Sequence, residues 1–493
     1  MGVLVNMEEL LRVGNKAAKQ AQKLGADEAE IFLYMENQAS VKFVGGIFAS
    51  RGGAVKGIKG SLMRIAEPWI KKKGLPIITS GTKAGVGVRA TIKNAIGFSS
   101  VSSIEEKKVI GAVEEAVKIA KIRPPDPNWV SLSEPKKLTG QYGIFDKRIS
   151  DLEIEKMLDL CVDCCITAGD FDKRIIQVMA MISAASVSFG VVNTQGIDVH
   201  DRGTFFFTGV GTKAKFGDEE VSSGDFLKSR TFTEDLRSIA LSASEKTIEC
   251  LNKKPLPEKY VGPVVFENTS WNQLFSIIFT SGISALNVQE NSSVYKGKIG
   301  KQVAKENVSV VDDGTLPDGF GTSNIDDEGV PKQRTRIIEK GVLYNLLYDN
   351  YAAKREKRES TGNANRQTIF GTAAYANQPT IMPSNLVFKP GKGNLEELVN
   401  EIKEGVLLKG SLIGALHSNR VTGDFSVTAD NAFKIEHGEV AYPLKPCTVA
   451  GNLYDALNYV AVTGDDLKSF GIPIYFANVM CPSVVIEKIV VST

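Results

Sequence analysis

The chain has 493 residues, of which 43% are hydrophobic and 24% charged, a composition typical of a globular protein with about three domains' worth of sequence. A net charge of +2 gives no electrostatic reason to propose nucleic acid or an anionic membrane as the main partner. No apolar run approaches the ~20 residues that span a bilayer, and the start MGVLVNMEELL lacks the pattern of a secretory signal. Six cysteines in a chain of this length do not form a disulfide framework. We therefore expect a cytoplasmic protein.

Helices and strands are mixed in the first 122 residues. Apolar residues at helical spacing predict a helix over 7–24, which stops at Gly25. Ser103 with Glu106 three residues later predicts a capping box for a helix that runs to about 121, where three nearby prolines end it. Four strands are predicted between these helices, at 29–35, 41–49, 86–92 and 95–99.

The next stretch, 123–257, follows the same pattern. Ser150 with Glu153 predicts a second capping box, for a helix that ends near Gly169. Residues 174–207 are rich in Val, Ile, Ser and Thr with glycine punctuation, which predicts a meander of strands, and a helix over 234–251 follows.

Pro255, Pro257 and Pro263 mark the predicted domain boundary. We therefore predict an α+β protein with an N-terminal region, 1–257, of two sub-parts (about 1–122 and 123–257) and a strand-rich C-terminal domain, 258–493. The predicted elements of that domain are a helix from about 270, a hairpin over 334–348 that turns at Lys340 and Gly341, a helix over 394–403 and a last strand over 484–491.

The segment VTGDFSVTADNAFKIEHGEVAYPLKPCTVAGNL, 421–453, is the most informative one. It predicts a glycine–acid turn, a strand, a reversal at His437 and Gly438, a returning strand over 439–443 and a helix at Gly451 and Asn452. Together with DDEG (326–329) and STGNANR (360–366), it resembles the TldD/PmbA family. The resemblance implies the fold of that family and a cytoplasmic, zinc-dependent peptidase that works as a pair of chains and trims or degrades unfolded peptides.

The zinc-binding chain of such a pair carries an H-E-x-x-x-H helix, which is not found in this sequence. The three histidines are His200, His417 and His437, and none are close enough to share one helical turn. Counted without gaps from Gly262, the family motif falls on Ser276, Ile277 and Ser281. This departure matches the PmbA branch, also called TldE. It implies no catalytic residue, metal or cofactor in this chain, with zinc on a TldD-like partner in a heterodimer, or self-association in its absence. Residues 51–81 are expected to be an insertion relative to typical members.

Three carboxylates gather at Asp326, Asp327 and Glu328, before Gly329. They could bind a hard cation or steer a substrate amine. They could also form a tight acidic turn that satisfies backbone amides, and this second interpretation is favoured.

Two glycine-containing segments are candidates for peptide binding, because glycine exposes the backbone that a peptide strand needs to pair with. We predict that they form a lip facing a cavity between two subunits, with the three carboxylates as a negative rim; the alternative is two structural turns. The residues are Thr361, Gly362, Asn363, Thr422, Gly423, Asp424 and Phe425.

Cys161, Cys164 and Cys165 form C-x-x-C-C, for which a buried helix face is favoured over metal or redox chemistry, since no further soft ligand pair accompanies them. Two rival functions stay open. One is a non-enzymatic binding or regulatory protein, of the type described as a modulator of DNA gyrase. The other is a hydrolase that uses the carboxylate cluster with another metal.

Overall fold

The computed structural model describes residues 7–46, 74–138, 140, 144–368, 372–470, 475 and 477–493. Most of the expected insertion, residues 51–73, lies outside the described residues. Its remainder, 74–81, is the first part of a long strand, β2.

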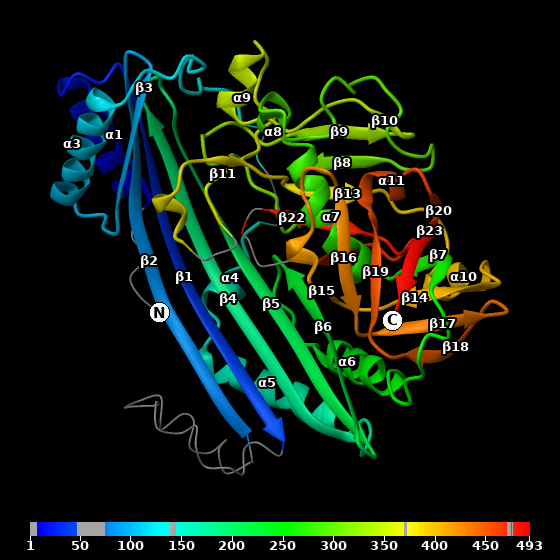
Figure 1. Cartoon of the computed structure of the whole chain (residues 1–493). Helices are drawn as coiled ribbons and strands as arrows, with labels where there is room; N and C mark the ends of the chain where they lie inside the picture. The colour runs from blue at the N-terminus through cyan, green and yellow to red at the C-terminus, as the bar shows by residue number, and fades with distance from the viewer. Residues whose placement is uncertain are drawn as a thin grey trace.

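A six-stranded antiparallel sheet forms the largest element of the structure (Figure 1). Four of its strands have 19 residues each, which corresponds to a length of about 60 Å. The strands, in their order across the sheet, are β3 (Ala95–Val101), β2 (Gly74–Ile92), β1 (Glu28–Gly46), β4 (Ile175–Asn193), β5 (Asp198–Phe216) and β6 (Glu219–Ser229). Strands of both predicted N-terminal sub-parts therefore share one sheet.

The predicted separation of the strands at 29–35 and 41–49 is wrong, because β1 runs without a break from Glu28 to Gly46; residues 47–49 lie outside the described residues. In the structure Glu36 is buried, and it accepts hydrogen bonds from the Tyr34 and Tyr475 hydroxyls at 3.0 and 3.3 Å. The predicted strands at 86–92 and 95–99 lie in β2 and β3, which the Lys93–Asn94 turn joins with both φ angles positive.

The two faces of the sheet have different coverings, because successive side chains of a strand point to opposite faces. Ile31, Leu33 and Val41 of β1 pack under the N-terminal helices, whereas Phe32 and Tyr34 face the C-terminal region. The helices on the first face are α1 (Met7–Lys23), α3 (Glu106–Ile122), α5 (Ile154–Gly169) and α6 (Arg237–Glu249), with a short α4 (Lys147–Ser150) beside them.

Both predicted capping boxes are wrong. The Ser103 hydroxyl accepts from the Glu105 amide at 3.2 Å, and α3 begins only at Glu106 without a side-chain cap. Ser150 ends α4 instead, where its hydroxyl donates to the Lys147 carbonyl at 2.9 Å. In both places the serine closes a local turn before the helix begins.

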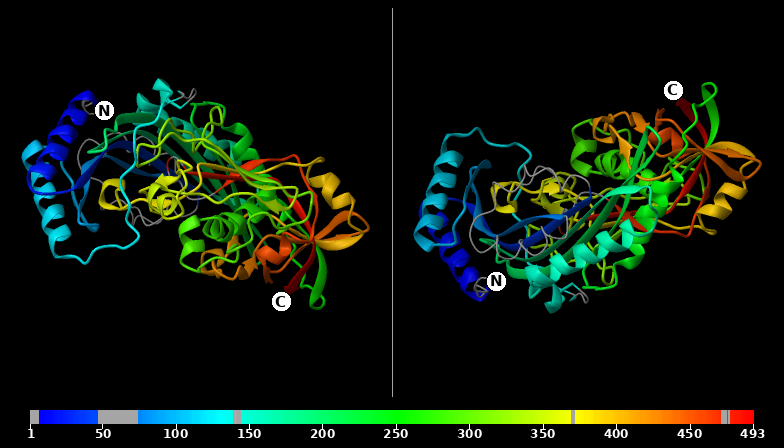
Figure 2. Two further views of the ribbon diagram at one scale, coloured as in Figure 1. Left: turned by 90° about the horizontal axis from the view of Figure 1, so that it is seen from above. Right: turned by 90° about the horizontal axis from the view of Figure 1, so that it is seen from below.

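The C-terminal region consists of two further sheets with the helix α7 (Asn268–Gly282) packed against them (Figures 1 and 2). One sheet contains, in order, β10 (Val342–Leu343), β9 (Arg334–Glu339), β8 (Val310–Asp313), β13 (Asn385–Phe388), β22 (Asn478–Cys481) and β21 (Lys468–Phe470). The other contains β15 (Leu412–Ile413), β16 (Asp424–Ala429), β19 (Cys447–Asn452), β23 (Val484–Ser492), β7 (Tyr260–Phe266), β14 (Glu404–Leu408), β17 (Ala432–Glu436) and β18 (Glu439–Leu444), with β20 (Val460–Thr463) paired to β23.

Short elements complete this region. They are α8 (Ala285–Gln289), α9 (Asn350–Arg355), β11 (Ala364–Asn365), η3 (Ala374–Ala376), β12 (Thr380–Ile381), α10 (Leu395–Asn400), η4 (Ala415–His417) and α11 (Leu453–Ala456). None of the helices in the described part of the chain is long and apolar enough to cross a membrane.

Most predicted C-terminal elements are confirmed. The hairpin turns at Lys340 and Gly341, and the second reversal lies at His437 and Gly438, with positive φ at all four residues. The segment 424–436 differs, because it is two strands, β16 and β17, in separate places of the sheet. A strand that the sequence did not reveal, β19, precedes α11. The mixed α+β fold class is confirmed.

Candidate functional site

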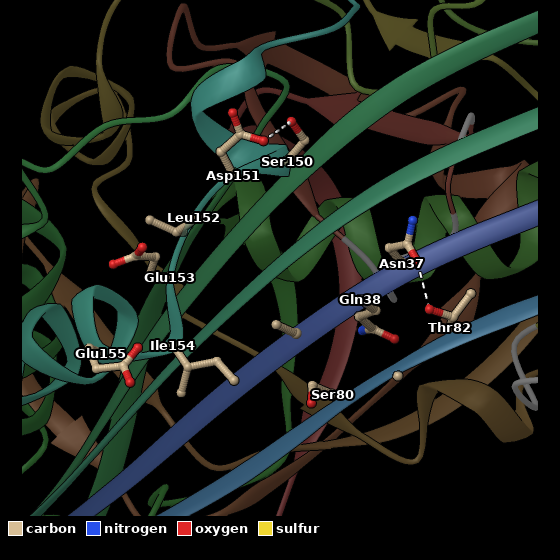
Figure 3. Close-up of a pocket in the computed structure, with 12 residues that line it drawn as sticks. Asn37, Gln38, Ser80, Thr82, Ser150, Asp151, Leu152, Glu153, Ile154 and Glu155 are labelled. Atoms are coloured by element: carbon tan, nitrogen blue, oxygen red, sulfur yellow. Dashed lines mark hydrogen bonds between the residues drawn. The ribbon is translucent and has the colours of Figure 1, made fainter. Parts of the chain in front are cut away.

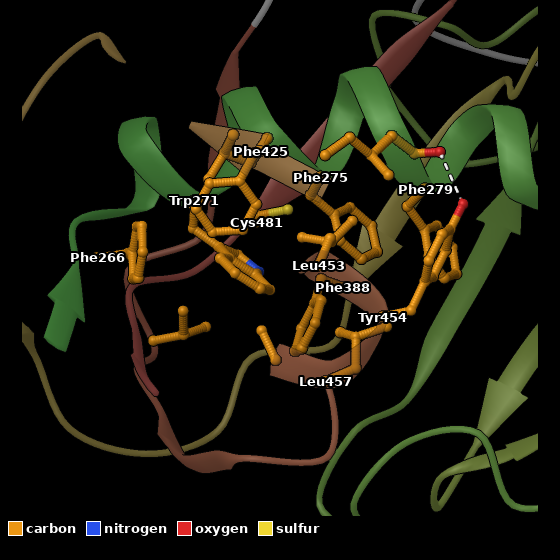
Figure 4. Packing of buried hydrophobic residues seen from close by; sticks show 14 of the residues in the cluster. Phe266, Trp271, Phe275, Phe279, Phe388, Phe425, Leu453, Tyr454, Leu457 and Cys481 are labelled. Atoms are coloured by element: carbon orange, nitrogen blue, oxygen red, sulfur yellow. Dashed lines mark hydrogen bonds between the residues drawn. The ribbon is translucent and has the colours of Figure 1, made fainter. Parts of the chain in front are cut away.

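The helix α7 has one face in the core and one face toward a cavity. Its core face carries Trp271, Phe275 and Phe279, which are fully buried (Figure 4). Phe275 stacks on Phe279, whereas Trp271 meets Phe266, and Phe275 meets Phe388, edge to face. The opposite face is half-buried and carries Gln273, Ser276, Ile277 and Thr280, spaced as residues on one side of a helix must be. Two of these, Ser276 and Ile277, are the positions where the zinc motif of the resembling family falls.

This outer face of α7 forms the floor of a cavity of about 300 Å³, here called the α7 pocket. The pocket lies where β6, the edge of the large sheet, meets β21, the edge of a C-terminal sheet; the rings of Phe226 and Phe470 on these strands are 5.4 Å apart. Its wall is mostly apolar and consists of Ile277, Met382, Pro383, Leu416, Phe470, Ala477 and Val479.

Two cations line the α7 pocket, Lys228 from β6 and Arg420 from the segment before β16. The Lys228 ammonium lies 4.6 Å from the centroid of the Phe320 ring. Lys228 is half-buried as a residue, and the loss of water around its ammonium group lowers its pKa to about 8. No described carboxylate forms an ion pair with either cation.

The first predicted lip segment, 360–363, lies beneath the surface. The Thr361 hydroxyl donates to Asn363 Oδ1 at 2.6 Å, and Asn363 Nδ2 donates to Asp312 Oδ2 at 2.7 Å. Gly362 has φ +73°, and a Cβ on it would lie 2.5 Å from the Pro331 carbonyl oxygen. Only glycine fits this position, so the turn is fixed by packing.

The second predicted lip segment, 422–425, is a surface turn with two buried residues. Thr422 and Asp424 are exposed, and the Thr422 hydroxyl donates to Asp424 Oδ2 at 2.6 Å, which lowers the pKa of that carboxyl. Gly423 has φ +91° and would place a Cβ 2.4 Å from the Tyr454 ring, and Phe425 is part of the core in Figure 4.

Neither segment lines the α7 pocket, but each is attached to residues that do. Asn363 Nδ2 donates to the carbonyl of Met382 at 3.0 Å, and Met382 is in the pocket wall. Arg420, also in the wall, lies two residues before Thr422, and its carbonyl accepts from the Tyr454 hydroxyl at 3.4 Å. Each segment is thus linked to one residue of the pocket wall, and contact of either segment with a peptide stays a prediction.

Asp326, Asp327 and Glu328 are 1%, 6% and 0% exposed, so they form no negative rim on the surface of this chain. Asp326 accepts backbone hydrogen bonds from Glu328, Val330 and Ala364 at 2.9, 2.9 and 3.0 Å. These contacts are those of the acidic-turn interpretation. Burial raises the pKa of Asp326 well above its usual range and that of Asp327 to about 6.

Glu328 belongs to a buried ion network that the sequence did not reveal. Arg89 Nη2 donates to Glu328 Oε1 and to Glu30 Oε2, each at 2.8 Å, and Arg366 also pairs with Glu30. Glu30 and Arg89 are directly opposite each other on β1 and β2, whereas Glu328 and Arg366 come from the C-terminal region. The network therefore joins the large sheet to the segment that carries both the acidic turn and the first lip segment. A charged residue within an apolar strand was the only sequence signal for it.

Comparison with known proteins bears on this arrangement. The PmbA/TldA metallopeptidase central-domain and C-terminal-domain models match residues 147–251 and 257–493. The chain belongs to the PmbA/TldD family. An uncharacterized protein of Methanocaldococcus jannaschii is 30% identical over 417 residues, which are 84% of this chain and 91% of that protein.

Two solved structures share the fold of this PmbA/TldD-family chain. TldE from Thermococcus kodakarensis and a Thermotoga maritima protein, described as a candidate modulator of a DNA gyrase, each have a TM-score of 0.79 and 25% sequence identity. Each comparison covers 99% of this chain and 100% of the other.

The zinc ion implied by the metallopeptidase family does not fit the residues at α7. The outer face of the helix offers two hydroxyls, an amide and an aliphatic side chain. Both hydroxyls are used within the helix: Ser276 donates to Asn272 Oδ1 at 2.6 Å and Thr280 to the Ser276 carbonyl at 2.5 Å. Across the part of the chain that the structure describes, no group of three His, Cys, Asp or Glu side chains is placed to hold a metal ion.

The cysteine prediction is confirmed for this PmbA/TldD-family chain. Cys161, Cys164 and Cys165 lie on the buried face of α5, packed against β1 and β4. Burial raises the pKa of Cys164 to about 11 and that of Cys165 to about 12, so neither thiol is activated.

A larger cavity, of about 790 Å³, shares no lining residue with the α7 pocket and lies between α4, α5 and the long strands β1 and β2 (Figure 3). Its lining includes Asn37, Thr82, Asp151 and Glu153, and Thr82 donates to Asn37 Oδ1 at 2.7 Å. None of its described lining residues is a predicted site residue, whereas the floor of the α7 pocket carries two positions of the zinc motif. The smaller α7 pocket is therefore the better candidate site.

Proposed function

We propose that this chain is the non-catalytic, PmbA/TldE-like subunit of a cytoplasmic metallopeptidase pair that acts on unfolded peptides. A separate TldD-like chain supplies the zinc and the general base. This chain shapes the peptide cavity and stabilises its partner.

The observation that carries the proposal is the outer face of α7. The helix is present, it faces a pocket, and its core face is fully packed, as a catalytic helix would need. At the motif positions, however, it presents Ser276 and Ile277, which provide neither an imidazole nor a general-base carboxylate. A helix beside a pocket that lacks both the zinc ligands and the general base supports a non-catalytic role for this chain.

An exposed apolar surface next to the pocket supports the pairing of two chains. Ile413, Leu416 and Val421, on β15 and the segment after it, are 62%, 51% and 44% exposed. Leu416 also lines the α7 pocket, so this surface continues into it. Neighbouring exposed apolar side chains of this kind mark interaction sites. A TldD-like chain, or a second copy in its absence, is the partner that we propose for it.

Co-purification from the native host, followed by mass spectrometry and metal analysis, tests this function. We expect a chain with an H-E-x-x-x-H motif to co-purify, and zinc to accompany that chain. The isolated chain should hold well under one zinc per molecule and cleave no unstructured peptide. One tightly held zinc in the isolated chain, lost on replacing Cys161 and Cys164, would contradict the proposal.

The second candidate function is a non-enzymatic regulator, favoured by the description of the Thermotoga maritima neighbour. A gyrase subunit in place of a TldD-like chain in the same co-purification would support it. A hydrolase built on Asp326, Asp327 and Glu328 is disfavoured, because these carboxylates are buried and already bound to backbone amides and Arg89.

A further inference from the structure

The charge of the α7 pocket is one-sided. Lys228 and Arg420 are its charged residues among the lining residues that the structure describes, and none of the others there is acidic. The hydroxyls of Ser276 and Thr280 already donate hydrogen bonds to acceptors within α7. The charged donors available to a ligand are therefore the ammonium and guanidinium groups, above a mostly apolar wall that also includes the side-chain amides of Gln273 and Asn478.

The two cations reach the pocket from different parts of the chain. Lys228 comes from the edge strand β6 of the large sheet, and Arg420 from the segment between η4 and β16. Phe320 beneath the ammonium offers only a cation–π contact at 4.6 Å. Desolvation without a carboxylate partner disfavours the charged form of Lys228, and a bound anion would restore it.

We propose that the α7 pocket binds the carboxy-terminal residue of an unfolded peptide, with the terminal carboxylate between Lys228 and Arg420 and an apolar side chain against Ile277 and Phe470. A cavity of about 300 Å³ is at the lower end of the range of small-ligand pockets, about 300–1,000 Å³, so it accommodates a terminal residue and not a folded segment. This inference rests on the proposed function in one respect, namely that the ligand is a peptide. The pocket of this subunit would then hold one end of the peptide that the partner chain cleaves.

Fluorescence anisotropy with the isolated full-length chain tests the inference without any peptidase activity. The probe is a short unstructured peptide that carries a dye at its N-terminus and ends in leucine, either as the free acid or as the C-terminal amide. Because a charge-assisted hydrogen bond is lost with the amide, we expect the free acid to bind at least about tenfold more tightly.

The variants locate the site. Lys228→Met should abolish the preference for the free acid, and Lys228→Arg should retain it. Arg420→Ala, at an exposed side chain that does not endanger folding, should weaken free-acid binding several-fold. Lys389→Met, at an exposed lysine outside the pocket, is the matched control and should change nothing. Thermal unfolding of each variant verifies that it is folded.

Three results would overturn the inference: equal affinity for acid and amide, an acid preference that survives both Lys228→Met and Arg420→Ala, or binding of octanoate without binding of the peptide acid. Loss of cleavage in a reconstituted pair, with the acid preference intact in the isolated chain, would count against the proposed function alone.

Discussion

Replacing Arg89 with methionine removes the central cation of the buried network. Arg89 is 4% exposed, its Nη2 atom contacts Glu30 and Glu328 at 2.8 Å each, and its guanidinium carbon lies 5.3 Å from the centroid of the Trp129 ring. Methionine retains the aliphatic stem and much of the volume, so the change tests the charge more than the packing.

The expected cost follows from the burial of the carboxylates. Glu30 and Glu328 are both fully buried, and neither can be reached by water when Arg89 is lost. Removing one partner of a buried ion pair costs about 3–5 kcal/mol, because an uncompensated charge remains in the interior. Glu30 retains Arg366 and Glu328 retains the Asn350 amide, which places the expected loss at the lower end, about 3 kcal/mol.

Urea unfolding, followed by both circular dichroism and tryptophan fluorescence, measures this loss and reveals whether the transition is two-state. Lys16→Met is the matched control, since Lys16 pairs with Glu106 at an exposed site where a loss below about 1 kcal/mol is expected. Glu328→Gln, alone and combined with Arg89→Met, gives the coupling energy between the two residues. A loss for Arg89→Met no larger than for Lys16→Met would refute the view that this network holds the large sheet to the C-terminal region.

Three further predictions concern single sites. Burial raises the pKa of Asp312 from 3.8 to about 6, so the carboxyl binds its proton more tightly in the folded chain than in the unfolded one. The contribution of this group to the free energy of unfolding is therefore full below pH 4 and falls by about 2–3 kcal/mol toward pH 7. Urea midpoints measured from pH 4 to pH 7 should fall less for Asp312→Asn than for the parent chain, and an equal fall would contradict this prediction. Gly423→Ala should lower the free energy of unfolding by at least about 1–2 kcal/mol, because φ is positive there and the added Cβ would meet the Tyr454 ring. Thr422→Ala, at an exposed residue, should leave thermal unfolding nearly unchanged. Thr422 is therefore the residue with which to test the predicted peptide lip in a cleavage assay. Cys164 and Cys165 should react with a thiol reagent at pH 8 only after denaturation, and rapid labelling of the native protein would show that α5 is not packed as described.

Local signals predicted the elements that depend on local physics. The helix at 7–24 and the two turns at Lys340–Gly341 and His437–Gly438 follow from helical spacing and from residues that tolerate positive φ. The continuity of β1 was not predictable in this way, because the partners of Glu36 and Asn37 at its middle include residues distant in the sequence. Thr82 donates to Asn37, and Tyr475, more than 400 positions later, donates to Glu36. The capping box predicted at Ser103 does not form because the Ser103 hydroxyl accepts from a nearer backbone amide, that of Glu105.

The candidate site divides along the same line. The position of α7 and its lack of zinc ligands could be read from the sequence, because they depend on one helix and one motif. The pocket could not, because Lys228 comes from a sheet outside the C-terminal domain. The partners of Arg89 and Arg366 lie 59, 239 and 336 positions away, so no local pattern contains the ion network. Because Glu328 is part of this buried ion network, the acidic turn 326–328 lies in the interior, although its sequence is typical of an exposed turn.

Cleavage of an unstructured peptide, by the isolated chain and by the chain reconstituted with a TldD-like partner from the same host, tests the central claim most directly. We expect no cleavage by the isolated chain at any zinc concentration, and zinc-dependent cleavage by the pair. Zinc-dependent cleavage by the isolated chain would contradict the claim, because α7 would then be a catalytic helix after all.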